Sequence, residues 1–417
     1  MSPLIQHTID HLFRHESGKM IAVLSRMLGL QQMHLAEDIV QDTLLKAMNT
    51  WAYNGIPDKP AAWLYRVAHN RAVDLLRKEN AYRLHQPRLE YLLQQESGSH
   101  QVEELFDTDQ IMDSQLKMMF VCCHPAIPVD SQISLILKTL CGLSNKEIAR
   151  AFLKDEDTIA KRNYRAREKI RTESISLELP PPSRMKEFLH SVLHSLYLLF
   201  NEGYHSTHPE KLIREELCEE AMRLTFLLTK HPATNSSQTY ALLALFCFQA
   251  SRFNARLDDK GNIILLKYQD RKLWYKPLIN QGNLFLQQAS QEETSVYHLQ
   301  AAIAWLHATA PDFRQTNWKA IYHLYCALAE LQSSDIILLN KAIAASYAID
   351  RSAGLEELQN IKGLHNNHLY HAAYGEIYFD EGRFDEAKKC YEQALARATT
   401  AAEQQLLRNK IAGCAQT

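Results

Sequence analysis

The stretch KTLCGLSNKEIARAFLKDEDTIAKRNYRAREKIR, residues 138–171, contains the most specific local pattern of the chain. Gly142 can end one helix, because a glycine just past a helix adopts the left-handed conformation without strain. Ser144 can cap the next helix together with Glu147, three residues later. A polar turn then precedes a third helix, which begins near Asp157 and is rich in arginine and lysine. A short helix, a tight turn and a basic helix predict a helix-turn-helix whose second helix enters the major groove of DNA.

The distribution of charge favours a polyanion partner over a plain helical hairpin. Residues 161–171 carry six basic side chains against one acidic, and residues 63–88 carry six against two. Between them, residues 92–120 carry six acidic side chains against one basic. Two basic patches separated by an acidic connector indicate two places where a polyanion contacts the chain. For either patch alone, a solvated helix face is the alternative interpretation.

The composition is that of a soluble globular protein made of helices. The 417 residues have a formal net charge of −2, 46% hydrophobic and 23% charged residues, which excludes a disordered or collagen-like chain. Glycine and proline occur only 13 times each, so long helices are favoured over hairpins. No stretch predicts a membrane span or a signal peptide, and the eight cysteines follow no repeating spacing. We therefore expect an all-α, cytoplasmic protein with reduced thiols and no membrane partner.

Polar and proline-rich stretches divide the chain. Pro180, Pro181 and Pro182 cannot lie inside a helix and form a stiff spacer. The predicted segments are a helical domain over 1–91, an acidic linker over 92–112, a second helical domain over 113–175, a proline-rich linker over 176–183 and a helical extension over 184–417. Within the extension, residues 256–269 predict a turn followed by a short extended piece.

The end of the extension contains a recognisable repeat. Within HAAYGEIYFDEGRFDEAKKCYEQALARA, residues 371–398, small and aromatic residues fall at the offsets of a tetratricopeptide repeat (TPR), namely Gly375, Tyr378, Ala387, Tyr391 and Ala394. One repeat cannot bury its own apolar face, so neighbouring helices must stack on it. The functional interpretation is a helical surface for a protein partner. The alternative is a cap that only packs on the rest of the extension.

Three stretches in order resemble regions 2 and 4 of bacterial RNA polymerase sigma factors of the extracytoplasmic-function (ECF) class, in the sigma-70 family. They are AEDIVQDTLLKAMNTW (36–51), AAWLYRVAHNRAVDLLRK (61–78) and GLSNKEIARAFLKDEDTIAKRNYRAREKIR (142–171). Two more stretches resemble the subgroup with a long C-terminal helical, TPR-like extension. They are FVCCHPAIPVDSQISLILKTLCGLS (120–144) and YLLFNEGY (197–204).

The resemblance implies three contacts, to core RNA polymerase and to two elements of promoter DNA. The residues implied to dock on the clamp coiled coil of the beta-prime subunit are Asp38, Gln41, Asp42 and Leu45, and the beta subunit is a further implied partner. Recognition of the −10 element falls to Asn54, Gly55, Arg66, Asn70, Arg71 and Arg77. Recognition of the −35 element falls to Asp157, Thr158, Ala160, Lys161, Tyr164 and Arg165. Trp63, at helical spacing, is assigned to the core rather than to base stacking.

Two residues depart from the family pattern. Asp157 stands where glycine is common, and its carboxylate favours a helix N-terminus but repels a nearby phosphate. Asn163 stands where an apolar residue usually packs. A buried asparagine without partners costs about 1–3 kcal/mol. Both departures bear on how the basic helix lies in the groove.

Nothing in the sequence predicts an enzyme, a cofactor or a metal. Cys122, Cys123 and His124 suggest a metal site, but adjacent cysteines rarely ligate one ion and no CxxC motif lies near. Nucleotide-binding and hydrolase motifs are missing. The alternative function is a helix-turn-helix regulator or TPR-type scaffold without polymerase contact. Residues 36–78 favour the sigma factor, because an ordinary regulator needs no polymerase-docking helix beside a strand-opening helix.

Overall fold

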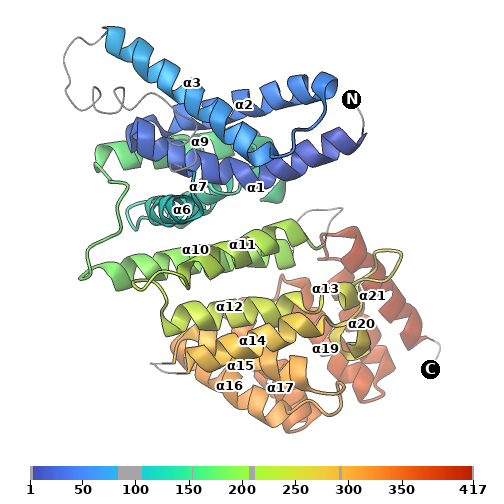
Figure 1. Cartoon of the computed structure of the whole chain (residues 1–417). Coiled ribbons are helices and arrows are strands. Elements are labelled where there is room, and N and C mark those ends of the chain that lie inside the picture. The colour runs from blue at the N-terminus through green and yellow to red at the C-terminus, as the bar shows by residue number, and fades with distance from the viewer. Residues whose placement is uncertain (1–2, 83–105, 153, 206–211, 291–293, 416–417) are drawn as a thin grey trace. The chain divides into compact units, whose positions relative to one another are not determined.

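The protein is built from helices, which confirms the predicted all-α class. A computed structural model describes residues 3–82, 106–152, 154–205, 212–290 and 294–415. Within these ranges the ribbon is made of helices and connecting segments (Figure 1), and the only extended pairing is an isolated antiparallel bridge between Leu257 and Ile263. In the same ranges, no helix is both long enough and apolar enough to cross a bilayer.

The chain forms two compact units, residues 1–198 and 199–417. The division falls inside helix α10 (Met185–Tyr204) rather than at the proline-rich spacer over 176–183. The hydroxyls of Ser191 and Ser195 donate to Gln132 Oε1 at 3.1 and 2.9 Å. These bonds to a side chain of the first unit explain why the beginning of α10 belongs to that unit.

The first unit begins with a bundle around one apolar core. Its helices are α1 (Pro3–Leu28), α2 (Met33–Asn54), α3 (Pro60–Tyr82) and α6 (Thr108–Cys122). Trp51 is buried in this core, and Trp63 packs edge-on against it with ring centroids 5.4 Å apart. The assignment of Trp63 to the core is therefore confirmed. Gly55, with φ of 77°, ends α2 in a conformation that favours glycine.

The second part of this unit contains the predicted helix-turn-helix segment. It consists of α7 (Val129–Thr139), α8 (Asn145–Ala151) and α9 (Glu156–Thr172). The capping box is confirmed, because Ser144 N and Oγ donate to Glu147 Oε2 at 2.8 and 2.7 Å, and Glu147 N donates back to Ser144 Oγ. Gly142, with φ of 66°, provides the turn before α8.

Asn163 is buried on α9 with both ends of its amide satisfied. Its side chain is 1% exposed. Oδ1 accepts from Ser134 Oγ of α7 at 2.7 Å, and Nδ2 donates to Asn145 Oδ1 at the start of α8 at 3.1 Å. The unusual asparagine thus joins all three helices, which fixes the pitch of α9 against its support.

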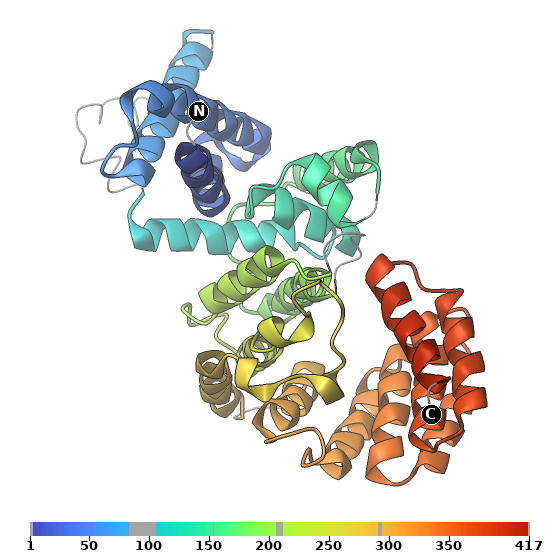
Figure 2. The same ribbon diagram turned by 90° about the vertical axis from the view of Figure 1, so that its right-hand side faces the viewer.

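The second unit is a series of stacked helices (Figure 2). They are α11 (Glu215–Leu228), α12 (Ser237–Ala250), α13 (Phe253–Arg256), α14 (Lys276–Ala289), α15 (Val296–Thr309), α16 (Trp318–Leu331), α17 (Asp335–Ala348), α18 (Arg351–Gln359), α19 (His368–Asp380), α20 (Phe384–Leu395) and α21 (Ala401–Cys414). Successive helices from α15 to α21 contact one another, so the predicted stacking of neighbours is confirmed. A Cβ at Gly375 would lie 2.6 Å from the Tyr391 ring, so α19 needs glycine to approach α20.

The asparagine junction yields a prediction about stability. Replacing Asn163 with alanine should lower the free energy of unfolding of α7–α9 by about 1–3 kcal/mol, since the fully buried Ser134 hydroxyl loses its acceptor. Hydrogen exchange of α7 and α9 peptides in increasing urea measures this loss. Asn49→Ala, at an exposed position of α2, is the matched control. Equal protection in both variants would contradict the structural role of Asn163.

Candidate polymerase and nucleic-acid interface

The predicted docking residues share the outer face of α2. Asp38, Gln41, Asp42 and Leu45 are all exposed, while the opposite face of the helix is buried in the core. Leu45 is a large apolar side chain that is 57% exposed among these polar neighbours. An exposed leucine flanked by carboxylates and an amide is suited to helix-on-helix packing with a partner.

The residues predicted for the −10 element lie at the end of α2 and along α3. Asn54 and Gly55 are exposed in the connection, and the four side chains predicted on α3 are exposed as well, namely Arg66, Asn70, Arg71 and Arg77. Arg71 Nη2 lies 3.8 Å from Asp42 Oδ2, so the docking face and the basic face of α3 adjoin. The structure thus places the residues predicted for polymerase docking next to those predicted for the −10 element.

Tyr53 was missed by reasoning from the sequence. It lies at the end of α2, directly before Asn54 and Gly55, and its side chain is 91% exposed. An open aromatic ring beside a loop can stack on an unpaired base. The sequence signal was an aromatic residue next to the glycine that ends the helix. Trp63 differs from Tyr53 because its ring packs against the core and is not open to a base.

The residues predicted for the −35 element lie on the outer face of α9. Asp157, Lys161, Tyr164 and Arg165 are exposed, and Thr158 and Ala160 are partly buried. Arg162, Arg167, Lys169 and Arg171 each pair with a carboxylate. Lys161 and Arg165 make no ion pair with any described residue, so their charges are the ones available for phosphates or base edges.

The thiols near the helix-turn-helix segment do not resemble metal ligands. Cys122 and Cys123 are fully buried, and burial raises the pKa of the Cys122 thiol to about 12. Cys122 Sγ lies 3.2 Å from Thr139 Oγ1, and His124 Nδ1 accepts from the Ala126 amide. Metal binding requires thiolates, which such burial disfavours. No group of three His, Cys, Asp or Glu residues suited to a metal occurs in the part of the chain that the structure describes.

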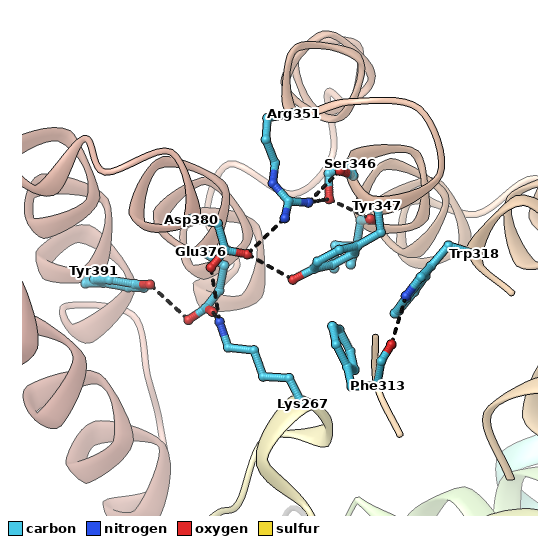
Figure 3. A network of polar contacts seen from close by, with 10 residues as sticks. Lys267, Phe313, Trp318, Ser346, Tyr347, Arg351, Glu376, Asp380 and Tyr391 are labelled. Atoms are coloured by element: carbon cyan, nitrogen blue, oxygen red, sulfur yellow. Dashed lines mark hydrogen bonds and ion pairs between the residues drawn. The ribbon is translucent and has the colours of Figure 1, made fainter. Parts of the chain in front are cut away.

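Two carboxylates on the terminal repeat, Glu376 and Asp380, form ion pairs with basic side chains from other parts of the chain (Figure 3). Lys267 Nζ lies 2.6 Å from Glu376 Oε2 and 3.4 Å from Asp380 Oδ1. Arg351 and the Tyr347 hydroxyl contact Asp380, and the Tyr391 hydroxyl donates to Glu376. Lys267 comes from η2 (Leu266–Tyr268), outside the repeat. The surface of α19 around Glu376 and Asp380 is therefore occupied by Lys267 of the same chain.

Burial by itself would raise the pKa of Glu376. Lys410 and Lys267 outweigh burial and lower it, so the carboxylate stays ionised in the folded unit. The paired charges keep Lys267 and its segment attached to α19. A protein partner must either bind another face of the repeat or displace this lysine.

The polar and aromatic composition of residues 266–280 has a structural cause. Arg271 Nη1 donates to the His307 carbonyl at 2.6 Å, and its guanidinium lies 3.9 Å from the centroid of the buried Trp274 ring. The predicted turn and extended piece are confirmed by the Leu257–Ile263 bridge around Gly261, whose φ is 79°. The segment therefore ties the beginning of the extension to its repeat helices.

The NEGY stretch, residues 201–204, serves close packing at the end of α10. A Cβ at Gly203 would lie 2.7 Å from Cys218 Sγ and 2.8 Å from the Arg214 carbonyl oxygen, so only glycine permits this approach. The Arg256 guanidinium lies 3.9 Å from the centroid of the Tyr204 ring and donates to the Tyr204 carbonyl. The stretch is thus explained by packing within the second unit.

Comparison with known proteins assigns families to three parts of the chain. Residues 12–82 match the sigma-70 region 2 family, which covers α2 and α3 and most of α1. Residues 189–290 match a family of unknown function, DUF6596, and residues 368–401 match a tetratricopeptide repeat. The region 2 match supports a sigma-factor role in transcription initiation and implies binding of core RNA polymerase and promoter DNA.

A relative extends this assignment over nearly the full length. An uncharacterized protein of Rhizobium meliloti (strain 1021) is 34% identical over 384 residues, which cover 91% of this chain and 90% of the relative. The chain belongs to the same family as this protein. Region 2 and the extension therefore occur together in both.

The docking face yields a second prediction. Replacing Leu45 with glutamate should weaken association with core RNA polymerase by at least about tenfold, because a helix-on-helix contact would then bury an unpaired carboxylate in place of an apolar side chain. Affinity is measured by titrating labelled protein with core enzyme. Leu331→Glu, at a position 56% exposed on α16, is the matched control. Equal affinities of both variants would exclude this face as the docking site.

Proposed function

We propose that this protein is an ECF-type sigma factor whose helical extension sets its activity. The observation that carries the proposal is the arrangement of α2 and α3. A region 2 match coincides there with an exposed face around Leu45 and an adjoining basic face around Arg71. A basic second helix, α9, supports the assignment of region 4.

Docking would place α2 against a helix of the beta-prime clamp, with region 4 directed to the beta subunit. Leu45 would be the apolar anchor, and Asp38 and Asp42 would pair with basic side chains of the partner. Because the opposite face of α2 lies in the core, docking leaves the fold of region 2 unchanged. The extension would offer a further surface to a protein partner, outside the part filled by Lys267.

The −10 element would be held as an opened strand. Unpairing a base costs a few kcal/mol, which phosphate contacts and stacking must offset. Arg66, Arg71 and Arg77 supply positive charge along α3, and Asn70 supplies hydrogen bonds. Tyr53 would stack on a base that Asn54 and Gly55 allow to approach the backbone.

The −35 element would be read as duplex by α9. Lys161 and Arg165 are free to contact phosphates or guanine edges, and Tyr164 is exposed between them. Asp157, in the first turn, can accept from a cytosine amino group while it stabilises the positive end of the helix dipole. Its repulsion of phosphate would keep the helix start pointed at bases.

The extension would take the place of a separate anti-sigma protein. A segment within the same chain is present at an effective concentration of roughly millimolar, so even a weak contact with regions 2 and 4 or with the polymerase is largely occupied. Residues 199–417 form their own compact unit, which suits a regulatory part.

A third prediction separates the two DNA contacts. With core polymerase, Arg165→Ala should weaken binding to a −35 duplex and leave binding to a preformed −10 bubble intact. Asn70→Ala with Arg71→Ala should instead reduce opening of a duplex promoter and leave −35 binding intact. Permanganate reactivity of thymines reports opening. Tyr53→Ala should also reduce it, and Tyr53→Phe, which keeps the ring, should restore it. Normal reactivity in the Asn70 and Arg71 variant would refute the strand-opening role.

A fourth prediction concerns the extension. Truncation after Leu198 keeps the bonds from Ser191 and Ser195 to Gln132 and removes the second unit. Promoter-specific transcription should change by at least about fivefold, the lower end of typical coupling between sites. Circular dichroism of the remaining part checks that it stays folded. A folded truncated protein that transcribes like the full chain would make the extension a passive part.

A further inference from the structure

A partly buried ion pair joins the two parts of the first unit that would bind different DNA elements. Arg167 Nη2 of α9 donates to both carboxylate oxygens of Glu37 on α2, each at 2.7 Å. The Glu37 side chain is only 8% exposed and that of Arg167 28% exposed. Charged side chains this buried need a partner, so the pair ties α9 to α2.

The same interface brings two backbones into direct contact. Gly18 of α1 faces the C-terminal end of α7, where a Cβ would lie 1.8 Å from the Leu140 carbonyl oxygen. Only glycine permits this approach. Beside it lies a small cavity, with Ser17, Glu37 and Gln41 on one wall and Lys138 and Gly142 on the other. The interface therefore has shape complementarity on α1 as well as a charge pair on α2.

This closed arrangement places the two predicted DNA-binding faces close together. Arg71 pairs with Asp42, which is five residues from Glu37, and Arg167 is two residues from Arg165. Two ion pairs of extended side chains, each spanning up to about 15 Å between Cα atoms, and short helical steps of five and two residues put Arg71 and Arg165 within about 45 Å of each other. Elements named −35 and −10 lie about 25 base pairs apart, or about 85 Å along B-DNA at 3.4 Å per pair.

We infer that the Glu37–Arg167 pair is a latch that holds the free protein in a closed state, which must open before both promoter elements can be bound. The inference rests on the proposed function for its purpose but not for its physical test. The predicted −35 face of α9 is exposed in the closed state, so a −35 duplex alone can bind without opening. Simultaneous contact with the −10 element requires α9 to leave α2.

An ion pair suits a reversible contact. When the interface opens, water solvates both Glu37 and Arg167, which offsets the lost attraction, whereas an apolar patch would stay exposed at a cost. Gln41 borders the same cavity and belongs to the predicted docking face. The latch therefore adjoins the predicted docking face, so that polymerase bound there would contact the edge of the α2–α9 interface.

The latch is tested with the full chain in two measurements. Glu37→Gln and Arg167→Gln each remove one charge, and the double variant Glu37→Arg with Arg167→Glu restores an ion pair in reverse. Glu356→Gln, at an exposed position of α18, is the control. Small-angle X-ray scattering and hydrogen exchange of α2 and α9 should show a larger radius of gyration and faster exchange in both single variants, with recovery in the double variant.

In the second measurement, the single variants should bind a promoter fragment carrying both elements several-fold more tightly in the presence of core polymerase, since the cost of opening is removed. Binding to a −35 duplex alone should be unchanged. Unaltered scattering and exchange in both single variants would overturn the latch, whatever the protein does in transcription. Opening with recovery, but without polymerase binding by any variant, would support the latch and overturn the proposed function.

Discussion

The first unit depends on how α2 divides its surface. One side, with Trp51 and Leu44, is buried in the core of the N-terminal bundle. The outer side presents Leu45 and its polar neighbours, and Glu37 at the edge pairs with Arg167 of α9. One helix therefore supplies part of the core, the proposed docking face and the contact to α9.

Local features were predictable from the sequence because they depend on neighbouring residues. The capping box of Ser144 and Glu147, the turn at Gly142 and the burial of Trp63 follow from spacing along the chain, and the structure confirms them. The close approach at Gly375 is likewise explained by the offsets of the repeat.

Contacts between distant residues were not predictable. Glu37 and Arg167 are 130 residues apart, and Lys267 and Glu376 are 109 apart, so no spacing rule relates them. In the sequence, Arg167 is indistinguishable from the other basic residues of a DNA-binding helix, and its different role follows only from its contact with Glu37. The exposure of Tyr53 was missed for a similar reason, because burial depends on what packs around a residue. Asn163 departed from the family pattern, and its partners on α7 and before α8 account for it.

Polymerase docking, strand opening and duplex reading would all be carried out by one chain, and site-specific photocrosslinking tests this combination most directly. A benzophenone amino acid replaces Leu45, Tyr53 or Tyr164 in turn, in complexes with core polymerase and promoter DNA. We predict adducts of position 45 with the beta-prime subunit, of position 53 with the single-stranded −10 region and of position 164 with the −35 duplex. DNA adducts at position 164 without any polymerase adduct at position 45 would contradict the account and indicate an ordinary helix-turn-helix regulator.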